Sequence, residues 1–381
     1  MNNDIGVYIH IPFCLSKCYY CDFASFANCE ALIEPYIDAL CEEILKNSEI
    51  LSQYNISTIY IGGGTPSYID AKYIVQILDT LKLFISSSSL KEVTIEVNPN
   101  SITKEKLEMY KEAGVNRLSI GLQSTYDKVL KMIGRAHKLK DFEETLNLAN
   151  EVGFSNISLD LIYPLPDLSL EEFKNTVDYA ISLKEKNIKH ISIYNLEIHE
   201  NTKLAFLLKE GYISLVDEDT EYEMYKYLKD TFEANEYHRY EISNYALKGY
   251  ESIHNLKYWN QEQYLGFGSS AASFFGGRRY SNLKDVREYI NNIKSNKSVR
   301  SECEELDLLA LMKEYVMLNL RKTEGLDKTK FKRKYQKDVY DIFSEEINEL
   351  VKDGLLKDEK GHIMLTDRGL EVANLVWEKF V

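Results

Sequence analysis

The sequence lacks any long hydrophobic run. No stretch of apolar residues in the 381-residue chain reaches the roughly 18 residues that a membrane-spanning helix needs. The first residues also lack the basic start and the long apolar stretch that are typical of a signal peptide. We therefore expect a cytoplasmic protein. Apolar residues still make up 44% of the chain, which is enough to build a sizeable buried core.

Positive charge is also in short supply. The chain has 46 Lys and Arg residues against 60 Asp and Glu residues, which gives a formal net charge of −14. A nucleic-acid interface depends mainly on neutralising phosphates, so we expect no nucleic-acid partner. We interpret the basic stretch 328–337 as a solvated helix face.

Cysteine is scarce, and half of it is concentrated in one place. Of six cysteines, Cys14, Cys18 and Cys21 lie within eight positions of one another. Disulfides are rare in a reducing cytoplasm, so a disulfide framework is a poor interpretation. The grouping instead favours a metal site.

Short runs rich in β-branched residues alternate with amphipathic segments through the first half of the chain. This alternation predicts parallel strands with crossover helices, and six such units predict an α/β fold with a partial (β/α)6 barrel. Ligands of parallel α/β sheets bind beyond the carboxyl ends of the strands. We predict strands near residues 7–11, 58–61, 93–97, 117–120, 157–161 and 191–194, and helices near 31–51, 73–84, 104–113, 141–152 and 170–183.

The pattern changes towards the carboxyl end. We expect the barrel core to occupy residues 1–235, ending in a long helix, and an extension rich in aromatic residues and glycine to occupy 236–300. Residues 301–381 have a pattern of helix, short helix, helix, hairpin and final helix. That order predicts a small C-terminal α+β domain of winged-helix-like form.

The three grouped cysteines directly follow the first predicted strand with Cys-x3-Cys-x2-Cys spacing. Thiolates are the usual ligands of iron–sulfur clusters, and a tight loop can direct three sulfurs at three corners of a cubane. The fourth iron is then open to a small molecule. The alternative is a structural zinc site, for which Cys29 could supply the missing fourth ligand.

This spacing after a first strand resembles the radical S-adenosylmethionine (SAM) superfamily. Further motifs narrow the resemblance to relatives of oxygen-independent coproporphyrinogen III dehydrogenase, over nearly the whole chain. The resemblance implies a [4Fe-4S] cluster on Cys14, Cys18 and Cys21 that donates an electron to bound SAM, yielding methionine and a 5′-deoxyadenosyl radical. The motifs are residues 8–14, 62–66, 95–99, 121–123, 134–135 and 160–166.

The resemblance also implies which residues contact SAM. The glycine segment 62–64 would approach its amino group, since residues without a Cβ allow close backbone contact. Glu96 would bind the ribose hydroxyls, Arg135 the carboxylate and Tyr20 the adenine. Each assignment has a structural alternative. The glycines could form a simple turn and Glu96 could be an exposed charge at the rim. Arg135 could form a surface ion pair, and Tyr20 could pack within its own loop. The full predicted SAM set is Tyr8, Tyr20, Gly63, Gly64, Thr65, Glu96, Gln123, Arg135 and Asp160.

Two functions are compatible with this resemblance: oxidative decarboxylation of coproporphyrinogen III, and a HemW-type heme chaperone that binds heme and delivers it to other proteins. The decarboxylases read Cys-x3-Cys-x2-Cys-x-Cys, and Phe23 stands here in place of the last cysteine. Phe23 favours the chaperone, and we do not expect coproporphyrinogen dehydrogenase activity. Gln123, Arg135 and Asp160 match positions that serve a second SAM in the decarboxylases, so they do not decide the question. The net charge disfavours a third interpretation, a tRNA-modifying radical SAM enzyme.

A second motif supports heme as a ligand. His254-Asn-x-x-Tyr258-Trp259 matches the pattern of the HemW group. A neutral imidazole is a common axial ligand of heme iron, and aromatic residues can line a porphyrin pocket, so His254 is a candidate heme ligand. The alternative is that His254 and Trp259 belong to a packed inter-domain core. His10 is a further candidate, although its place predicts packing beneath the cysteines. The expected partners are heme and heme-accepting proteins, membrane-bound respiratory enzymes among them.

Overall fold

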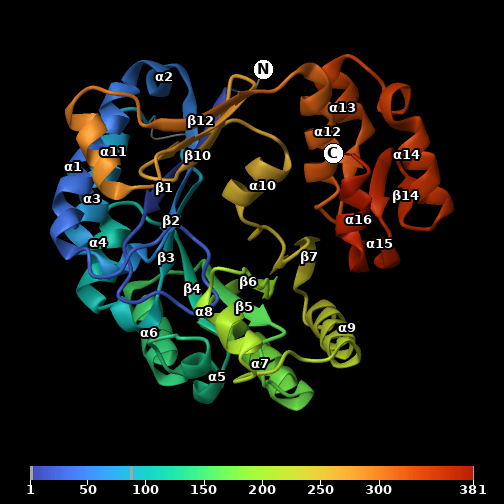
Figure 1. The fold of residues 1–381 in the computed structure, drawn as a ribbon, viewed down its shortest axis with the longest axis horizontal. Helices are drawn as coiled ribbons and strands as arrows, with labels where there is room; N and C mark the ends of the chain where they lie inside the picture. The colour runs from blue at the N-terminus through green and yellow to red at the C-terminus, as the bar shows by residue number, and fades with distance from the viewer. Residues whose placement is uncertain (1–2, 86–88, 381) are drawn as a thin grey trace.

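Six parallel strands form the centre of the fold in a computed structural model that describes residues 3–85 and 89–380. Neighbouring strands pair in the order β1-β2-β3-β4-β5-β6, each pair parallel. The six predicted strands and the partial barrel are therefore confirmed (Figure 1). The strands are β1 (Asp4–Ile11), β2 (Asn55–Gly63), β3 (Glu92–Val97), β4 (Arg117–Gln123), β5 (Ile157–Tyr163) and β6 (Ile188–Asn195).

Helices between these strands cover the outer face of the sheet (Figure 1). Their starts follow local capping rules: Asp70 and Thr103 each accept a backbone N–H of the first turn, and Ser169 forms a capping box with Glu172. The helix predicted over 31–51 is divided in two at Asn47. The helices are α1 (Ile33–Lys46), α2 (Ser48–Gln53), α3 (Ala71–Lys82), α4 (Lys104–Glu112), α5 (Asp127–Met132), α6 (Leu139–Val152) and α7 (Leu170–Ser182).

The sheet continues beyond the barrel strands at both edges. On the β6 side, β8 pairs antiparallel with β6 and then with β7. On the β1 side, β9 pairs parallel with β1, and β10, β11 and β12 follow as antiparallel strands. The region that sequence analysis describes as an aromatic extension therefore adds strands to both edges of the central sheet. These strands are β7 (His238–Glu241), β8 (Asn244–Ala246), β9 (Tyr264–Phe267), β10 (Ala272–Phe275), β11 (Arg278–Asn282) and β12 (Arg300–Glu305).

Helix α10 (Ile253–Trp259) carries the chain from one edge of the sheet to the other. It lies on the face opposite α1 and α3 (Figure 1) and contacts the amino-terminal halves of β1 and β2, where Gly6 and Thr58 face it. The buried carboxylate of Glu92, the first residue of β3, accepts the backbone N–H groups of Ile253 and His254 at 2.9 and 3.1 Å. Glu92 thus satisfies two of the unpaired amides at the start of α10 and compensates their positive end.

The remaining helices complete the barrel unit. The long helix predicted after residue 216 is present as α9 (Glu218–Ala234), and it packs against α7. α8 (Lys203–Lys209) lies between β6 and α9, and α11 (Val286–Lys294) packs against α1.

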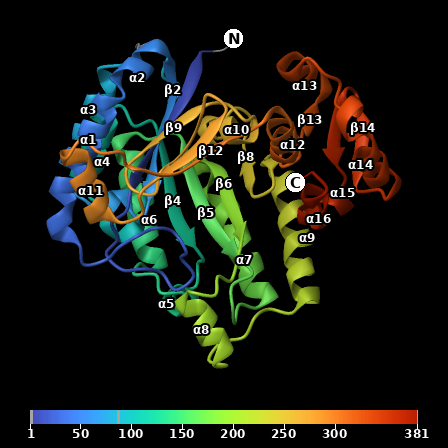
Figure 2. The same ribbon diagram turned by 45° about the horizontal axis from the view of Figure 1, so that its top comes forward.

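The C-terminal residues form a separate hydrophobic core, centred on side chains such as Phe331, Ile347 and Leu350. A three-stranded sheet in the order β13-β15-β14 accompanies its helices, which confirms the expected small α+β unit and its hairpin. The unit stands beside α9 and α10 (Figure 2), where Tyr335 Oη donates to Gln261 Oε1 at 2.7 Å. Its elements are α12 (Leu308–Asn319), β13 (Leu326–Asp327), α13 (Lys328–Tyr335), α14 (Tyr340–Lys352), β14 (Leu356–Glu359), β15 (His362–Leu365), α15 (Asp367–Glu371) and α16 (Ala373–Glu378).

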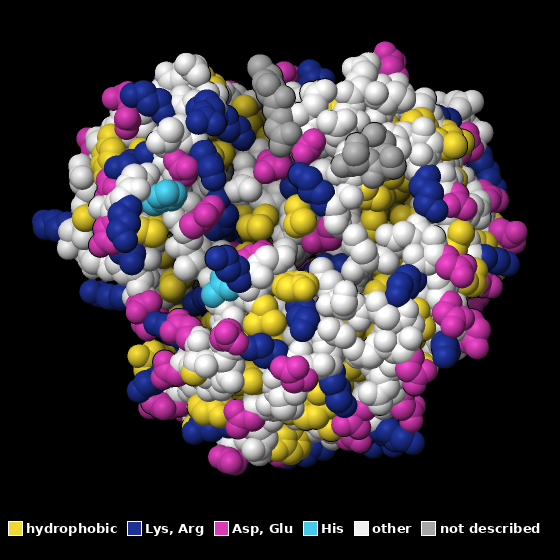
Figure 3. Space-filling model, turned by 180° about the vertical axis from the view of Figure 1, so that it is seen from behind, with side chains coloured by type: hydrophobic (Ala, Val, Ile, Leu, Met, Phe, Trp, Pro, Cys, Tyr) yellow, Lys and Arg dark blue, Asp and Glu magenta, His cyan; other side chains and the backbone are white. Residues whose placement is uncertain are grey.

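The surface carries both signs of charge. Lys and Arg side chains alternate with Asp and Glu side chains over the face seen in Figure 3. Within residues 3–85 and 89–380, no helix is both long and apolar enough to cross a membrane. The division into 1–235, 236–300 and 301–381 stays a prediction.

Replacing Glu92 by Ala should destabilise the protein by about 1–3 kcal/mol, since two buried N–H groups lose their acceptor. Urea denaturation followed by circular dichroism measures the change. Glu223→Ala, on the exposed face of α9, is the matched control and should change stability by no more than about 0.5 kcal/mol. Equal stability of the two variants would contradict the role of Glu92.

Candidate functional site

The three grouped cysteines lie on the loop between β1 and α1, here called the cysteine loop (residues 12–29). A backbone hydrogen bond from Cys14 N to Phe26 O, 3.0 Å long, closes the loop. Thr65 Oγ1 donates to Cys14 Sγ at 3.4 Å, and Arg135 Nη1 donates to Cys18 Sγ at 3.7 Å. Cys14, Cys18 and Cys21 all line one cavity of about 480 Å³, the cysteine cavity.

The thiols at this cavity suit a cluster with an open metal position. All six cysteines are unpaired. Cys29, the alternative fourth zinc ligand, donates its thiol hydrogen to Ala27 O at 3.4 Å and is not among the described residues of the cavity lining. In the described part of the chain, no group of three or more His, Cys, Asp or Glu side chains is placed to hold a single metal ion. Three thiols facing one cavity fit an iron–sulfur cubane better than a four-ligand zinc site.

The three glycines at the end of β2 and directly after it allow close contacts that a side chain would block. A Cβ on Gly64 would lie 2.9 Å from Cys14 Sγ, and one on Gly62 would lie 2.9 Å from Glu96 Oε1. Gly63 has φ +114°, and a Cβ there would lie 2.7 Å from the His10 ring. The backbone therefore has no side chains where it meets the cysteine loop, and a ligand can approach it closely. Its amides are engaged within the protein, since Gly63 N donates to Glu96 and Gly64 N donates to Ile11 O at 2.8 Å.

Two carboxylates reach the cavity from β3 and β5, on either side of β4. Glu96 accepts hydrogen bonds from Gly63 N at 3.1 Å and Tyr60 Oη at 3.0 Å, and Asp160 accepts from Ser119 Oγ at 3.2 and 3.0 Å. Burial raises the pKa of Glu96 to about 7, with a further contribution from the nearby Asp160 charge. Burial also raises the pKa of Asp160. The pair can accept hydrogen bonds from ligand hydroxyls in either protonation state.

Arg135 and Gln123 add a cation and an amide to the cavity lining. Arg135 Nη2 donates to Gly121 O at 2.9 Å and to Asn98 Oδ1 at 3.3 Å, which orients the guanidinium at the cavity. Gln123 takes the left-handed backbone conformation with φ +68°. Its buried Oε1 has no hydrogen-bond partner among the described residues. An orphaned acceptor beside a cation fits a polar ligand that has both donor and anionic groups, as SAM has.

Most of the predicted site residues meet in this cavity, but two do not. Tyr8 faces a different cavity, and its hydroxyl bonds to His10 Nδ1 at 3.0 Å. His254 belongs to the described lining of neither. The predicted residues that line the cysteine cavity are Cys14, Cys18, Cys21, Tyr20, Gly63, Gly64, Thr65, Glu96, Gln123, Arg135 and Asp160.

Sequence reasoning missed other side chains of the lining. Tyr60, Ser119 and Asn98 come from β2, β4 and the segment after β3, and Tyr194 and His199 come from the end of β6 and the loop beyond it. The rule that ligands bind beyond the carboxyl ends of parallel strands could have indicated the β6 residues. No motif marks Tyr60 or Ser119, whose roles depend on hydrogen bonds to neighbouring strands.

A second cavity, of about 590 Å³, lies between the cysteine loop, α10, β9–β10 and α12. We call it the aromatic cavity, and its volume lies within the range of roughly 300–1,000 Å³ of small-molecule sites. Arg279 is the one basic Lys or Arg side chain in the described lining, and it pairs with Glu314. The buried hydroxyl of Ser270 has no described hydrogen-bond partner. The aromatic members of the lining are Tyr8, Phe23, Tyr258, Trp259, Tyr264 and Phe274.

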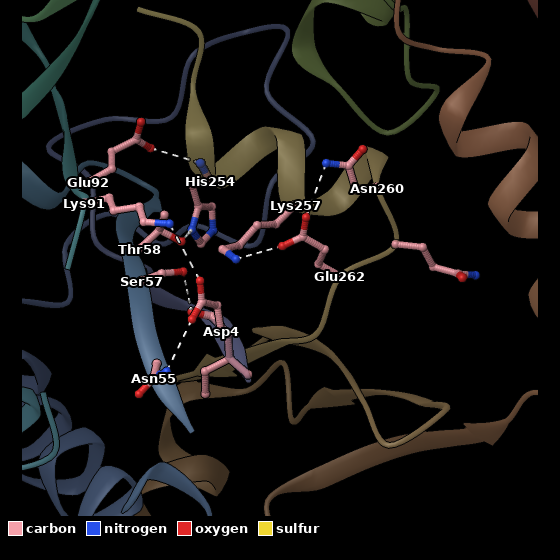
Figure 4. A network of polar contacts seen from close by, with 12 residues as sticks. Asp4, Asn55, Ser57, Thr58, Lys91, Glu92, His254, Lys257, Asn260 and Glu262 are labelled. Atoms are coloured by element: carbon pink, nitrogen blue, oxygen red, sulfur yellow. Dashed lines mark hydrogen bonds and ion pairs between the residues drawn. The ribbon is translucent and has the colours of Figure 1, made fainter. Parts of the chain in front are cut away.

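His254 is fully buried beneath this cavity. Its Nδ1 lies 2.8 Å from Thr58 Oγ1 on β2, in the network of Figure 4, and its Nε2 lies 2.7 Å from Tyr258 Oη. Burial, with smaller effects of Lys257 and Arg117, lowers the pKa of His254 to about 3, so the ring is neutral. Direct heme ligation by His254 stays a prediction, and it would require one of these two hydrogen bonds to break.

Comparison with known proteins places this geometry in a family. Residues 8–180 match the model of the radical SAM superfamily, and residues 306–372 match the HemN C-terminal domain. The heme chaperone HemW of Bacillus subtilis (strain 168) is 37% identical over 377 residues, which cover 99% of each chain. The chain belongs to the HemW family. HemW of Lactococcus lactis is 36% identical over 99% of this chain and 97% of its own, and HemW of Escherichia coli K12 is 30% identical over 99% and 98%.

A solved structure agrees with the fold of this HemW family member. Coproporphyrinogen III oxidase (HemN) from Escherichia coli, described as a radical SAM enzyme, superposes with a TM-score of 0.84. The match covers 99% of this chain and 89% of that one at 23% identity, which shows a shared fold. The expected superfamily and fold class are both confirmed.

Replacing Glu96 by Gln should alter how stability depends on pH. Because the folded chain binds this proton more tightly than the unfolded chain, stability should fall as pH rises from about 4.5 to about 7. Over this pH range the free energy of unfolding of the variant should decrease by up to about 3 kcal/mol less than that of the wild type, because one pKa unit corresponds to about 1.4 kcal/mol. Denaturation of apo-protein from pH 4 to 8 tests this, with the exposed Glu112→Gln as control. Parallel pH profiles for wild type and Glu96→Gln would contradict it.

Proposed function

We propose that this chain is a heme chaperone that carries a [4Fe-4S] cluster, binds SAM and heme, and transfers heme to recipient proteins. The observation that carries the proposal is its full-length similarity to proteins named heme chaperone HemW. Two separate cavities support the proposal, because one is lined by the three grouped cysteines and by polar side chains, while the other offers a large aromatic site. We propose that it acts in the cytoplasm.

The cysteine cavity offers each group that the cluster and SAM require. Cys14, Cys18 and Cys21 would hold three irons and leave the fourth open to SAM. The bare backbone at Gly63 and Gly64 would meet the amino group, Glu96 the ribose hydroxyls and Arg135 the carboxylate. When bound, cluster and SAM supply an electron and a source of a carbon radical, and the protein supplies position and shielding from water.

Phe23 of the cysteine loop bears on the choice between a heme chaperone and a porphyrinogen decarboxylase. Phe23 occupies the position of the additional cysteine of the decarboxylases, is 71% exposed, and lines both cavities together with Asp22. An apolar side chain at this wall contributes contact area to a flat aromatic ligand. It offers no thiol to the porphyrinogen chemistry. Phe23 therefore favours heme handling over porphyrinogen oxidation.

Replacing Cys14 by Ser should remove most of the iron, the sulfide and the visible absorption of anaerobically reconstituted protein, because the cluster loses one of three ligands. Cys29→Ser is the matched control, a neighbouring thiol outside the cavity lining. Iron analysis and absorption spectra decide the matter. Full cluster content in Cys14→Ser would refute the ligand assignment.

The function itself is tested by two assays on the same reconstituted protein under anaerobic conditions. A heme titration followed by absorption should saturate at one heme per chain. Incubation with coproporphyrinogen III, SAM and a reductant should give no protoporphyrinogen. Turnover without heme binding would reverse the proposal and assign the chain as a coproporphyrinogen III dehydrogenase.

A further inference from the structure

Helix α10 places a phenol and an imidazole one turn apart on the same face. His254 and Tyr258 are four residues apart, and their rings meet edge to face with centroids 5.0 Å apart. A neutral imidazole has one N–H donor and one acceptor. With the proton on Nδ1, His254 donates to Thr58 Oγ1 at 2.8 Å and accepts the Tyr258 hydroxyl at 2.7 Å. The phenol oxygen of Tyr258 is thereby held in a fixed orientation.

The two residues differ in their access to a ligand. Tyr258 is partly exposed and lines the aromatic cavity, whereas His254 is fully buried behind it. The imidazole of His254 is held away from the cavity by its burial and by its hydrogen bonds to Thr58 and Tyr258. Of the two residues, Tyr258 is the one whose side chain lines the cavity.

We propose that Tyr258 is the axial ligand of ferric heme in the aromatic cavity, and that His254 is its positioning residue. This proposal rests on the proposed heme-binding function. Tyrosinate is an established heme ligand. The O–H bond of Tyr258 would break as the iron–oxygen bond forms, one proton would be released to solvent, and the iron would stay ferric. His254 would stay neutral and would orient the phenol oxygen through its hydrogen bond.

The surroundings of Tyr258 suit a porphyrin. The ring of Tyr264 meets that of Tyr258 edge to face with centroids 4.5 Å apart, and Trp259 adjoins it. These rings supply flat apolar surface, as a macrocycle requires. Arg279, on the opposite strand β11, can exchange its ion pair with Glu314 for one with a porphyrin carboxylate.

Other side chains of the cavity are less suited to ligation. The His10 ring has both nitrogens engaged, by Tyr8 Oη at 3.0 Å and Ala24 O at 2.9 Å. The His10 ring packs against Gly63, which lines the cysteine cavity, so the Tyr8–His10 pair forms part of the wall between the two cavities. The Tyr258 hydroxyl donates to His254 Nε2, and Thr58 on β2 holds the other nitrogen of that imidazole. The hydrogen-bond acceptor of Tyr258 is therefore fixed to the sheet.

The test is spectroscopic and uses the full chain loaded with ferric heme. Absorption and resonance Raman spectra should show phenolate-to-iron charge transfer in the wild type, and Tyr258→Phe should abolish it. Tyr8→Phe, Tyr264→Phe and the exposed Tyr212→Phe should all retain it. His254→Ala should keep the phenolate signature but weaken heme affinity about 10- to 100-fold, as expected for a residue that acts through the ligand.

The outcomes separate the two levels of the proposal. Heme bound at one per chain without a phenolate signature, or with a signature lost in Tyr8→Phe or Tyr264→Phe, overturns the assignment to Tyr258 and leaves the proposed function standing. A wild-type spectrum of imidazole ligation that vanishes in His254→Ala overturns the division of roles. Failure of the wild type to bind heme overturns the proposed function and the ligand assignment together.

Discussion

The Glu92 carboxylate, buried at the start of β3, holds the amino end of α10 against the sheet through the amides of Ile253 and His254. The whole second half of the site depends on this contact, because α10 carries the chain from the β8 edge to the β9 edge. The imidazole of His254 adds a side-chain link to Thr58 on β2. With α10 fixed, Tyr258 and Trp259 form one wall of a cavity separate from the cysteines.

The cysteine loop connects the two cavities physically. Asp22 and Phe23 line both of them, directly after Cys21. A ligand in either cavity therefore touches the segment that carries a predicted cluster ligand. The loop is itself held by the pairing of Cys14 with Phe26 and by Thr65 on the sulfur of Cys14. Cluster, SAM and heme would share one short, well-anchored piece of backbone.

Sequence alone predicts the barrel well, since its strands are largely buried on both faces and amphipathic helices follow them, with side-chain caps at α3, α4 and α7. It also predicts that residues after the strands converge, as Gly64, Glu96 and Arg135 do. It does not predict β9 beside β1, because short strands far apart in the chain leave no periodic signal. Tyr8 lies before the end of β1 and lines the aromatic cavity instead of the cysteine cavity. The motif makes His254 a candidate heme ligand, but its burial and its two hydrogen bonds become visible only in three dimensions.

The most direct test of the account is a crystal structure of reconstituted, heme-loaded protein with anomalous diffraction at the iron edge. The account predicts two separate iron sites: a cluster within bonding distance of Cys14, Cys18 and Cys21, and a heme iron in the aromatic cavity bonded to the Tyr258 oxygen. A heme iron in the cysteine cavity, or outside both cavities, would contradict it.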